Sequence, residues 1–387
     1  MRIFFLPTSY PSEEHPQKNS FIYEQAKELA NLGHEIVILH INKLPTRSFL
    51  SIVDGSIKRV ENEFSIEYRT MQKTLFEDKF ILLNKNAFIN NAERLYQRAV
   101  SETGEPDVIY AHFSCWAGYA GAILSKKYKV PLVTTEHFGK IVSGNTPKKL
   151  LDCIEYVIEN SDEFICVSEQ LRKAILSNIN TKNKPIVISN MVDKAFHYSA
   201  PKQNCGEFNF CAIGRLTAPK NYELLILAFV RAFSGDENIK LRIGGDGEEL
   251  PKLKKLVKKH GREGQILFLG GLSRGETINE YVNCDAFALA SLYETYGIVY
   301  REALAIGRPI VTTNHGGFSK EDWHDEYGYM VPNNDVDAFA KALRMMVDNI
   351  SDFDGENISK LCLQDCSSES VGKRIESVLL NVRRSGK

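Results

Sequence analysis

The sequence lacks any apolar run that approaches the roughly 20 residues needed to span a bilayer. It also has little net charge, because 48 Lys and Arg residues face 49 Asp and Glu residues, for a formal charge of −1. Residues 1–200 carry 24 basic and 23 acidic residues, and residues 201–387 carry 24 and 26. A nucleic-acid-binding protein depends on an excess of basic residues that neutralise phosphates. The composition therefore argues against a membrane-spanning protein and against a nucleic-acid binder.

The N-terminus has few features of a signal peptide. Met1 to Pro7 hold one positive charge and a short apolar run that ends at proline, without the longer apolar stretch and small-residue cleavage site of such peptides. We therefore predict a buried strand at Ile3–Leu6 and a cytoplasmic protein. Three basic pairs fit either a solvated surface or a peripheral contact with the anionic inner face of the plasma membrane. These pairs are Lys126-Lys127, Lys148-Lys149 and Arg172-Lys173.

Metal-binding patterns are also scarce. The eight cysteines are scattered, mostly inside apolar segments, and such cysteines behave as small buried hydrophobic side chains. Cys362 and Cys366 lie one helical turn apart, but no second Cys or His pair accompanies them, as a zinc site requires. Of two Asp-x-Asp strings, Asp335–Asp337 is predicted to cap a helix and Asp352–Asp354 lies in a polar stretch. We expect no metal and no cofactor.

Domain organisation follows from length and pattern. A chain of 387 residues is long for a single core, so two domains are expected. In both halves, short buried strands alternate with amphipathic helices, which is typical of doubly wound parallel α/β sheets. We predict Rossmann-like domains over residues 1–198 and 205–365, a linker around residues 200–204, and a C-terminal helical segment over residues 366–387. Such sheets bind ligands at their carboxyl edges.

The apolar pattern that predicts individual helices and strands is weaker in one region, residues 44–90. Residues 44–90 show weak periodicity, and we predict an edge strand at Val60–Tyr68 there. Elsewhere the pattern is clearer, with helices predicted at Phe21–Leu32 and Val371–Arg383 and a strand at Glu35–Leu39.

Two glutamates flank a predicted strand-to-helix turn within Ala286–Ile310. Glu294 follows the strand, Gly297 opens the next helix, and Glu302 lies about one turn inside it. Carboxylates at these positions could accept hydrogen bonds from sugar hydroxyls, although a surface Glu pair on an α/β crossover is common. A helix N-terminus binds a diphosphate through its free backbone N–H groups. Those groups belong to Gly297, Ile298 and Val299.

Two cations follow another predicted strand, within Ala212–Asn221. Arg215 and Lys220 lie five residues apart on the loop that starts at Gly214. Cations at such a position can hold a diphosphate and stabilise the charge that builds on it when a sugar leaves. A pair of solvated surface cations would show the same pattern.

These two segments resemble the retaining glycosyltransferases of the GT-B fold, in particular the GT4 group (glycosyl transferases group 1) with its E-x7-E signature. The resemblance covers nearly the whole chain. It implies two Rossmann-like domains with a central cleft, and a C-terminal helix that packs back toward the N-terminal domain. The residues that fall on the family motifs are Gly214, Arg215, Leu216, Lys220, Glu294, Gly297, Glu302, Ala303, Gly307 and Pro309.

The resemblance also implies roles for individual residues. Glu294 is expected beside the transferred sugar, and Glu302 on the nucleotide ribose. Arg215 and Lys220 are expected to bind the diphosphate, and His137 is expected to lie against the donor sugar. Together with Glu294, these three residues are the expected catalytic residues. Gly245 lies either near the nucleobase or in a plain tight turn. The remaining donor-binding residues are expected to be Gly214, Gly270, Gly297, Ile298 and Val299.

The acceptor side is expected in the N-terminal half, where the chain departs from the family. Asn19 and Ser20 replace a common Gly-Gly pair, and Ser20 could equally be a helix N-cap. His112 either lines the cleft or is a satisfied, partly buried histidine. Met191 replaces the glycine of a family turn, and Lys320 replaces a glutamate near the donor sugar.

The implied function is metal-independent, retaining transfer of a hexose from a UDP- or GDP-sugar to an acceptor hydroxyl. The acceptor would be a glycan or a lipid-linked molecule in cell-surface polysaccharide or glycolipid assembly. No side chain is placed as a covalent nucleophile, and the leaving diphosphate itself can deprotonate the acceptor. Two alternatives stay open: a nucleotide-sugar epimerase of the same fold, and a non-catalytic subunit that stabilises a partner transferase.

Overall fold

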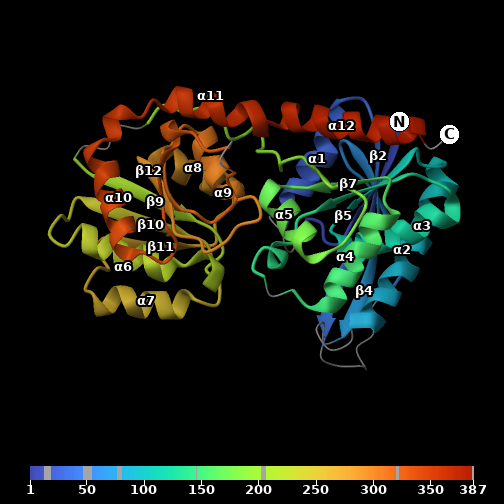
Figure 1. The fold of residues 1–387 in the computed structure, drawn as a ribbon, viewed down its shortest axis with the longest axis horizontal. Coiled ribbons are helices and arrows are strands. Elements are labelled where there is room, and N and C mark those ends of the chain that lie inside the picture. The colour runs from blue at the N-terminus through green and yellow to red at the C-terminus, as the bar shows by residue number, and fades with distance from the viewer. Residues whose placement is uncertain are drawn as a thin grey trace. The chain divides into compact units, whose positions relative to one another are not determined.

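The computed structural model describes residues 1–12, 19–46, 55–75, 81–144, 146–201, 206–319 and 322–385. The chain forms two compact units, one of Met1–Met191 with Ser368–Lys387 and one of Val192–Ser367 (Figure 1). Each unit is built on a parallel sheet with helices, so the predicted α/β fold class is confirmed. The first boundary falls at Met191, ahead of the polar stretch that we predicted as the linker.

The sheet of the first unit has eight strands within the described residues, in the order β3-β4-β2-β1-β5-β6-β7-β8. Neighbouring strands are parallel except for β3 and β4. The order reverses between β1 and β5, and loops at such a reversal are where doubly wound sheets bind ligands. The strands are β1 (Arg2–Pro7), β2 (Glu35–Thr46), β3 (Lys58–Glu61), β4 (Ser65–Leu75), β5 (Val108–His112), β6 (Leu132–Glu136), β7 (Glu163–Cys166) and β8 (Ile186–Val187).

Helices cover both faces of this sheet, which explains the almost continuous apolar character of its central strands. On β1, Phe4 packs into one core cluster and Phe5 into the other, because successive side chains of a strand point to opposite faces. The helices are α1 (Ser20–Asn31), α2 (Ile81–Thr103), α3 (Tyr119–Tyr128), α4 (Lys148–Asn160) and α5 (Glu169–Asn178), with the short turns η1 (Ser114–Gly118) and η2 (Gly139–Ile141).

The last helix, α12 (Ser368–Ser385), lies beside α1 in the first unit (Figure 1). Its Ile375 and Leu379 enter the core cluster that contains Ile22 of α1. Polar contacts add to this apolar contact, with His34 Nε2 2.8 Å from Glu376 Oε1.

The predicted edge strand at Val60–Tyr68 has the wrong bounds, although β3 does lie at the edge of the sheet. The structure has two antiparallel strands there, β3 and β4, which a turn at residues 62–64 connects. Strand β2 also continues to Thr46 and pairs with β4 along its length. Both strands carry buried polar side chains such as His40 and Glu67, which bind each other at 2.7 Å, and these weaken the apolar pattern of the sequence.

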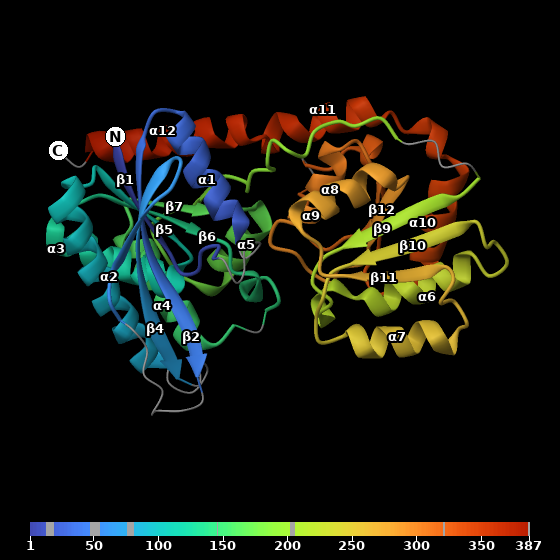
Figure 2. The same cartoon turned by 180° about the vertical axis from the view of Figure 1, so that it is seen from behind.

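The second unit contains a parallel sheet in the order β11-β10-β9-β12-β13-β14, with its reversal between β9 and β12. Figure 2 shows α6 and α7 on one face of β9–β11 and α8 with α9 on the other. The strands are β9 (Phe208–Ile213), β10 (Ile239–Gly244), β11 (Ile266–Gly270), β12 (Ala286–Leu289), β13 (Ile310–Thr313) and β14 (Gly328–Val331). The helical segments are η3 (Ala218–Lys220), α6 (Tyr222–Ala232), α7 (Leu250–Lys259), α8 (Arg274–Asn283), α9 (Ile298–Ala305), η4 (Asp325–Tyr327), α10 (Val336–Asp348), η5 (Ile350–Asp352) and α11 (Gly355–Cys366).

The C-terminal helices confirm one predicted cap and add a second. Asp335 is the N-cap of α10 and accepts a hydrogen bond from Ala338 N at 2.8 Å. Asp354 caps α11 in the same way, accepting from Glu356 N at 3.0 Å. Neither α11 nor β14 was predicted from the sequence.

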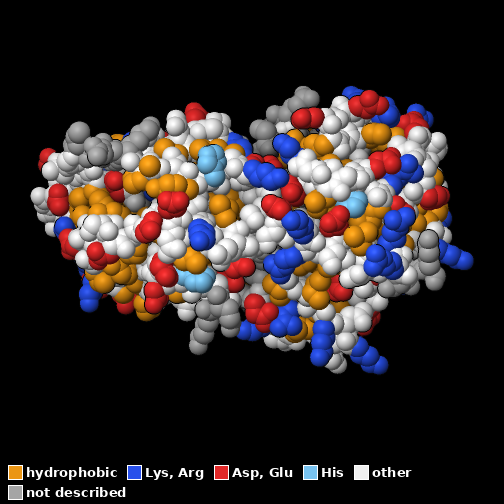
Figure 3. Space-filling model, turned by 90° about the horizontal axis from the view of Figure 1, so that it is seen from above, with side chains coloured by type: hydrophobic (Ala, Val, Ile, Leu, Met, Phe, Trp, Pro, Cys, Tyr) orange, Lys and Arg blue, Asp and Glu red, His pale blue; other side chains and the backbone are white. Residues whose placement is uncertain are grey.

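The surface in Figure 3 carries Lys and Arg side chains interspersed with Asp and Glu, in keeping with the near-zero net charge. Of the helices in the described ranges, none is both long and apolar enough to cross a bilayer.

A buried arginine stabilises the second unit. Arg308 is 1% exposed and donates to the carbonyl oxygens of Tyr281 at 2.9 Å, Val282 at 3.0 Å and Ser199 at 3.0 Å. We expect Arg308→Met to lower the free energy of unfolding by about 3–5 kcal/mol, because these carbonyls lose a charged donor. The thermal midpoint then falls by roughly 6–20 °C.

A matched control is Arg231→Met, which removes an arginine that is 55% exposed and paired with Asp337 in the same unit. That variant is expected to stay within about 0.5 kcal/mol of the parent. Equal midpoints for the two variants would contradict a structural role for Arg308.

Candidate active site

The loops that carry the predicted donor site are neighbours in the structure. One follows β9 and runs from Gly214 to Asn221, and the other follows β12 and leads to Gly297. Because β9 and β12 pair in parallel, both loops leave the same edge of the sheet. The backbone links them directly, since Leu292 N donates to Pro219 O at 2.8 Å.

Lys220 and Glu294 meet where these loops touch. Lys220 Nζ lies 2.5 Å from Glu294 Oε1, although 74 residues separate them in the chain. Ser291 Oγ donates to the same carboxylate oxygen at 2.7 Å, and Glu294 N donates to His315 O at 3.0 Å. The Glu294 side chain is only 10% exposed, so its position is fixed by contacts with the protein.

The surroundings keep Glu294 ionised. Burial alone would raise the pKa of its carboxyl group. The charge of Lys220, the neighbouring His315 and the hydrogen bonds from Lys220 and Ser291 outweigh burial, and the pKa lies below its usual value. A buried carboxylate and an ammonium group thus stand together at the edge of the sheet.

Helix α9 presents its N-terminus at the same edge. Gly297, its N-cap, has φ 76° and makes no side-chain cap, and a Cβ added there would lie 3.0 Å from Tyr300 Cδ2. Glycine suits both the left-handed backbone and this close contact. The first-turn N–H groups of Ile298 and Val299 have no acceptor within the helix, so this end can bind an anion.

Glu302 lies on the next turn of α9 and is partly buried. Burial raises the pKa of its carboxyl group to about 7, against the opposing effects of Arg274 and of the Tyr281 hydroxyl, which lies 3.4 Å from Oε2. The nearby Asp193, itself paired with Arg274, also raises the pKa. This carboxyl group therefore changes charge near neutral pH.

The predicted glycines at 245 and 270 have a structural explanation. Gly245 N donates to Gly270 O at 2.7 Å, and Gly214 N donates to Gly244 O at 3.0 Å. A Cβ added to Gly245 would lie 1.9 Å from Gly214 O, so only glycine allows the loops to approach this closely. The tight-turn interpretation accounts for Gly245 without a ligand.

The two cations of the β9 loop differ in their surroundings. Lys220 has a side chain that is 21% exposed and paired, whereas Arg215 is exposed. Arg215 is thus free to turn toward a ligand, and Lys220 is already fixed beside Glu294.

Three residues near this site were missed by the sequence analysis. Ser291 and His315 contact Glu294 as described, and Arg301 on α9 holds the two loops beside it. Arg301 is 5% exposed, donates to Tyr296 O and, at 2.9 Å, to Gly317 O, and lies 4.1 Å from the ring centre of Phe318. Only proximity to Glu294 and to the glycine pair at 316–317 could have drawn attention to them in the sequence.

In the first unit, the structure brings His112 and His137 together. His112 Nδ1 lies 3.2 Å from His137 Nε2, and the rings are 0% and 8% exposed. Burial lowers the pKa of both, that of His137 to about 3, so both imidazoles are neutral at pH 7. The rings of Phe21 and Phe113 pack against His137 with centre distances of 4.6 and 5.0 Å.

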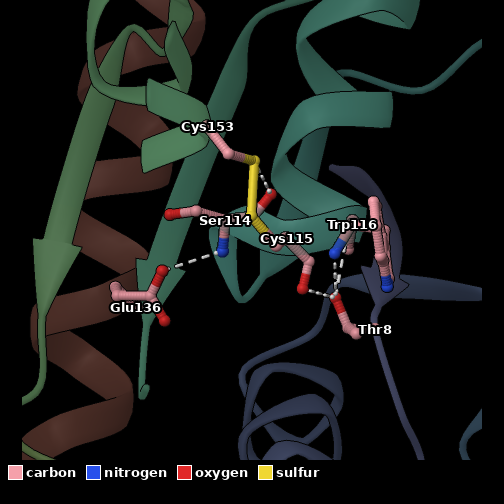
Figure 4. The surroundings of a disulfide bond; sticks show 7 residues. Thr8, Ser114, Cys115, Trp116, Glu136 and Cys153 are labelled. Atoms are coloured by element: carbon pink, nitrogen blue, oxygen red, sulfur yellow. Dashed lines mark hydrogen bonds between the residues drawn. A yellow bond between two sulfur atoms is a disulfide. The ribbon is translucent and has the colours of Figure 1, made fainter. Parts of the chain in front are cut away.

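A buried carboxyl group fixes the loop that carries His137. Glu136 is 1% exposed and accepts hydrogen bonds from the backbone N–H groups of Ser114 at 2.9 Å, His137 at 2.8 Å and Phe138 at 2.9 Å. Figure 4 shows the bond to Ser114 and, nearby, the Thr8 hydroxyl, which accepts from Trp116 N at 3.0 Å. The loops after β1, β5 and β6 are therefore joined around the two histidines.

Figure 4 also shows a disulfide between Cys115 of η1 and Cys153 of α4. The prediction that the cysteines are simple buried thiols is wrong for this pair, because packing of η1 on α4 brings together residues 38 positions apart. Within the described residues, no group of three or more His, Cys, Asp or Glu side chains could hold a metal ion. The free cysteines of the described residues are buried, as predicted: Cys166, Cys211, Cys284, Cys362 and Cys366. Cys205 lies outside those residues.

The expected acceptor loop is described only in part. Asn19 is the N-cap of α1 with φ 53° and no side-chain cap, and Ser20 is the first helical residue, so Ser20 as N-cap is wrong. Asparagine tolerates this left-handed backbone, which glycine also favours. Lys320 and residues 13–18 lie outside the described residues. Met191 is 2% exposed and ends the first unit.

Two family descriptions match the sequence. Residues 196–353 match Glycosyl transferases group 1, and residues 19–196 match Glycosyltransferase Family 4. Glycogen synthase of Mycobacterium tuberculosis is 25% identical over 406 residues, with 97% of this chain and 96% of that protein covered. N-acetyl-alpha-D-glucosaminyl L-malate synthase of Bacillus anthracis is 25% identical over 378 residues, with 94% and 93% covered.

Solved structures share the fold. Sucrose-phosphate synthase from Thermosynechococcus elongatus superimposes with a TM-score of 0.79 at 17% identity, with all of both chains covered. Anabaena HepE in complex with UDP and glucose has a TM-score of 0.73 at 18% identity, with 98% of this chain and all of that chain covered. With the two family matches spanning residues 19–353, the chain belongs to the group 1 glycosyltransferases and has the GT-B fold.

Proposed function

We propose that this protein transfers a hexose-type sugar from a nucleoside-diphosphate donor, a UDP- or GDP-sugar, to an acceptor hydroxyl with retention at the anomeric carbon. One observation carries the proposal. The ion pair between Lys220 and the buried Glu294 stands at the carboxyl edge of the second sheet, beside the N-terminus of α9. Positive groups for a diphosphate and a carboxylate for a sugar are thus assembled at one place.

In the proposed reaction, the diphosphate binds between Lys220 and the first-turn amides of α9, with Arg215 turning in from the surface. Negative charge grows on the leaving diphosphate as the bond to the sugar breaks, and these fixed positive groups stabilise it. Glu294 accepts hydrogen bonds from the sugar hydroxyls and balances positive charge on the sugar ring. Glu302 accepts from the ribose. Fixed cations and helix amides supply the electrostatic stabilisation for which other transferases use a metal ion.

The acceptor is proposed to be a glycan or a lipid-linked molecule that meets the first unit near Asn19, Ser20 and His112, and His137 beside them keeps the role predicted for it against the donor sugar. Support comes from the pair of neutral histidines and from the aromatic rings packed against His137. A neutral imidazole can donate a hydrogen bond to a hydroxyl group through its N–H and accept one at its other nitrogen, without a change of charge at pH 7. Relatives include alpha-monoglucosyldiacylglycerol synthase of Streptococcus pneumoniae, which is 24% identical over 301 residues, with 71% of this chain and 66% of that protein covered. A peripheral contact with the cytoplasmic membrane face belongs to the same proposal.

The proposal is tested by a thermal-shift screen of UDP-, GDP- and ADP-sugars, followed by turnover of the best donor with candidate acceptors in the presence of EDTA. We expect nucleotide release that depends on acceptor, and a product that keeps the donor's anomeric configuration by NMR. Free sugar or an epimer from donor alone would favour the epimerase alternative. Donor binding without turnover on any acceptor would favour a non-catalytic subunit.

Glu302 makes donor binding depend on pH. With a pKa near 7, its carboxyl group is mostly protonated at pH 6 and mostly ionised at pH 8. The ionised form accepts ribose hydroxyl hydrogen bonds more strongly. We therefore expect the Kd of the nucleotide sugar to fall by up to about tenfold from pH 6 to pH 8.

Isothermal titration with the nucleotide sugar is suitable, because this ligand has no terminal phosphate whose second ionisation, near pH 6, falls in that window. The Glu302→Gln variant is the matched control, and its Kd is expected to be weaker and flat over the same range. A pH dependence that persists in this variant would assign the effect to another group.

A further inference from the structure

A buried histidine beside the donor site has one ring nitrogen without a partner. His315 follows β13, is 2% exposed and stacks on the ring of Tyr300 with a centre distance of 4.5 Å. Its Nδ1 accepts a hydrogen bond from Gly317 N at 2.9 Å. Its Nε2 has no hydrogen-bond partner among the described residues.

The tautomer of His315 follows from these contacts. Burial lowers the pKa of the ring to about 4, so at pH 7 the imidazole is neutral and carries one proton. Because Nδ1 accepts from Gly317, that proton is on Nε2. The ring thus presents a buried N–H donor that bonds to nothing in the described protein, and a buried donor without an acceptor is unfavourable for the folded protein.

The free donor stands among the groups that the proposed function uses. The backbone oxygen of His315 accepts a hydrogen bond from Glu294 N at 3.0 Å. The charge of Glu294 raises the pKa of the ring and the charge of Lys220 lowers it. The ring atom between the two nitrogens, Cε1, would lie 3.5 Å from a Cβ added to Gly297, the N-cap of α9. Cε1 is bonded to Nε2, so this nitrogen is one bond away from the ring atom that lies next to the helix end proposed for the diphosphate.

Neighbouring residues hold this ring in place before any ligand arrives. Arg301 binds the oxygen of Gly317 at 2.9 Å, and so fixes the residue whose N–H group orients the imidazole. The ring is also enclosed by aromatic side chains, since Phe318 lies 5.8 Å from it between ring centres. A donor fixed in advance loses little conformational entropy when it binds.

We propose that the Nε2–H group of His315 donates a hydrogen bond to an oxygen of the bound nucleotide sugar, on its diphosphate or its transferred sugar. This inference rests on the proposed function. It makes His315 a donor-binding residue of the same site, and gives a role to the imidazole that lies between the rings of Tyr300 and Phe318.

Two substitutions separate the two ring nitrogens. In His315→Asn the side-chain oxygen stands close to the position of Nδ1 and can still accept from Gly317, but nothing replaces Nε2–H. In His315→Gln the longer amide reaches the position of Nε2 and can donate there, while the acceptor for Gly317 is lost. We expect the Asn variant to bind about 10- to 100-fold more weakly than the parent, and the Gln variant to retain more of the affinity.

The probes are UDP and UDP-glucose, or the matching GDP or ADP pair if the parent protein prefers one, with Kd from titration calorimetry and folding from near-UV circular dichroism. If the Asn variant loses affinity for both probes, the ligand oxygen that accepts from Nε2–H belongs to the diphosphate. If it loses affinity for the nucleotide sugar alone, that oxygen belongs to the sugar. If the Asn variant binds as well as the Gln variant or better, His315 has only a structural role and the inference is overturned. If the parent binds none of the probes, the proposed function fails first.

Discussion

Glu294→Gln is expected to lower the turnover of the nucleotide sugar by about 10²- to 10³-fold, a loss typical of removing one fixed charged group at a reacting centre. Glutamine keeps the shape of the side chain but not its negative charge. The amide can no longer balance positive charge on the sugar ring, and its NH₂ group competes for the position where Ser291 and Lys220 now donate to Oε1. The measurement is the initial rate of nucleotide release at saturating donor and acceptor.

Glu280→Gln provides the control. Glu280 also forms an ion pair in the second unit, with Arg242 at 2.7 Å, and its side chain is 15% exposed. This change is expected to leave turnover within about threefold of the parent once the fraction of folded protein is equal. A rate for Glu294→Gln that stays within tenfold of the parent would rule out a role for Glu294 in the chemical step.

Lys220→Ala is expected to have an effect of similar size, about 10²- to 10³-fold on kcat. The substitution removes the cation that would stabilise the leaving diphosphate. It also removes the charge that lowers the pKa of Glu294, so burial then favours the protonated carboxyl group. Because one change weakens two groups, the double variant with Glu294→Gln should lose much less than the product of the two single losses.

The control for this change is Lys252→Ala. Lys252 is paired with Glu223 at 2.6 Å in the same unit, but its side chain is 58% exposed. Turnover of that variant should match the parent, since exposed ion pairs contribute little. If the double variant loses a factor in kcat equal to the product of the two single losses, Lys220 and Glu294 contribute to the reaction independently of each other. That result would contradict the prediction.

The sequence predicted which loops carry the proposed donor site but could not show the contacts between them. Strand ends and the following loops were predictable from apolar runs and glycines, and the motif placed Lys220 and Glu294 on two such loops. Their contact depends on β9 pairing with β12, which no local pattern reveals across 74 residues. His315 was missed for a related reason, since its burial depends on Tyr300 and Phe318 packing around it.

The predictions of the fold that were wrong all concern contacts that apolar periodicity does not record. Strands β2 and β4 bury polar side chains that bond to each other, so the pattern of apolar residues underestimates their length. Likewise, the contact of Cys115 with Cys153 arises from packing of two helical segments and leaves no mark in the spacing of the cysteines. A polar side chain that is buried with a polar partner does not contribute to the apolar periodicity of the sequence.

The position of α12 in the first unit has a consequence for how the protein is made. Ile375 and Leu379 complete a core whose other members, such as Ile22, come much earlier in the chain. A nascent chain therefore exposes the apolar side of α1 until residues beyond Ser368 leave the ribosome. The second unit, by contrast, is continuous in sequence and can fold earlier. The unit that starts first is the one that finishes last, which makes any early stop in translation a threat to its solubility rather than only to its activity.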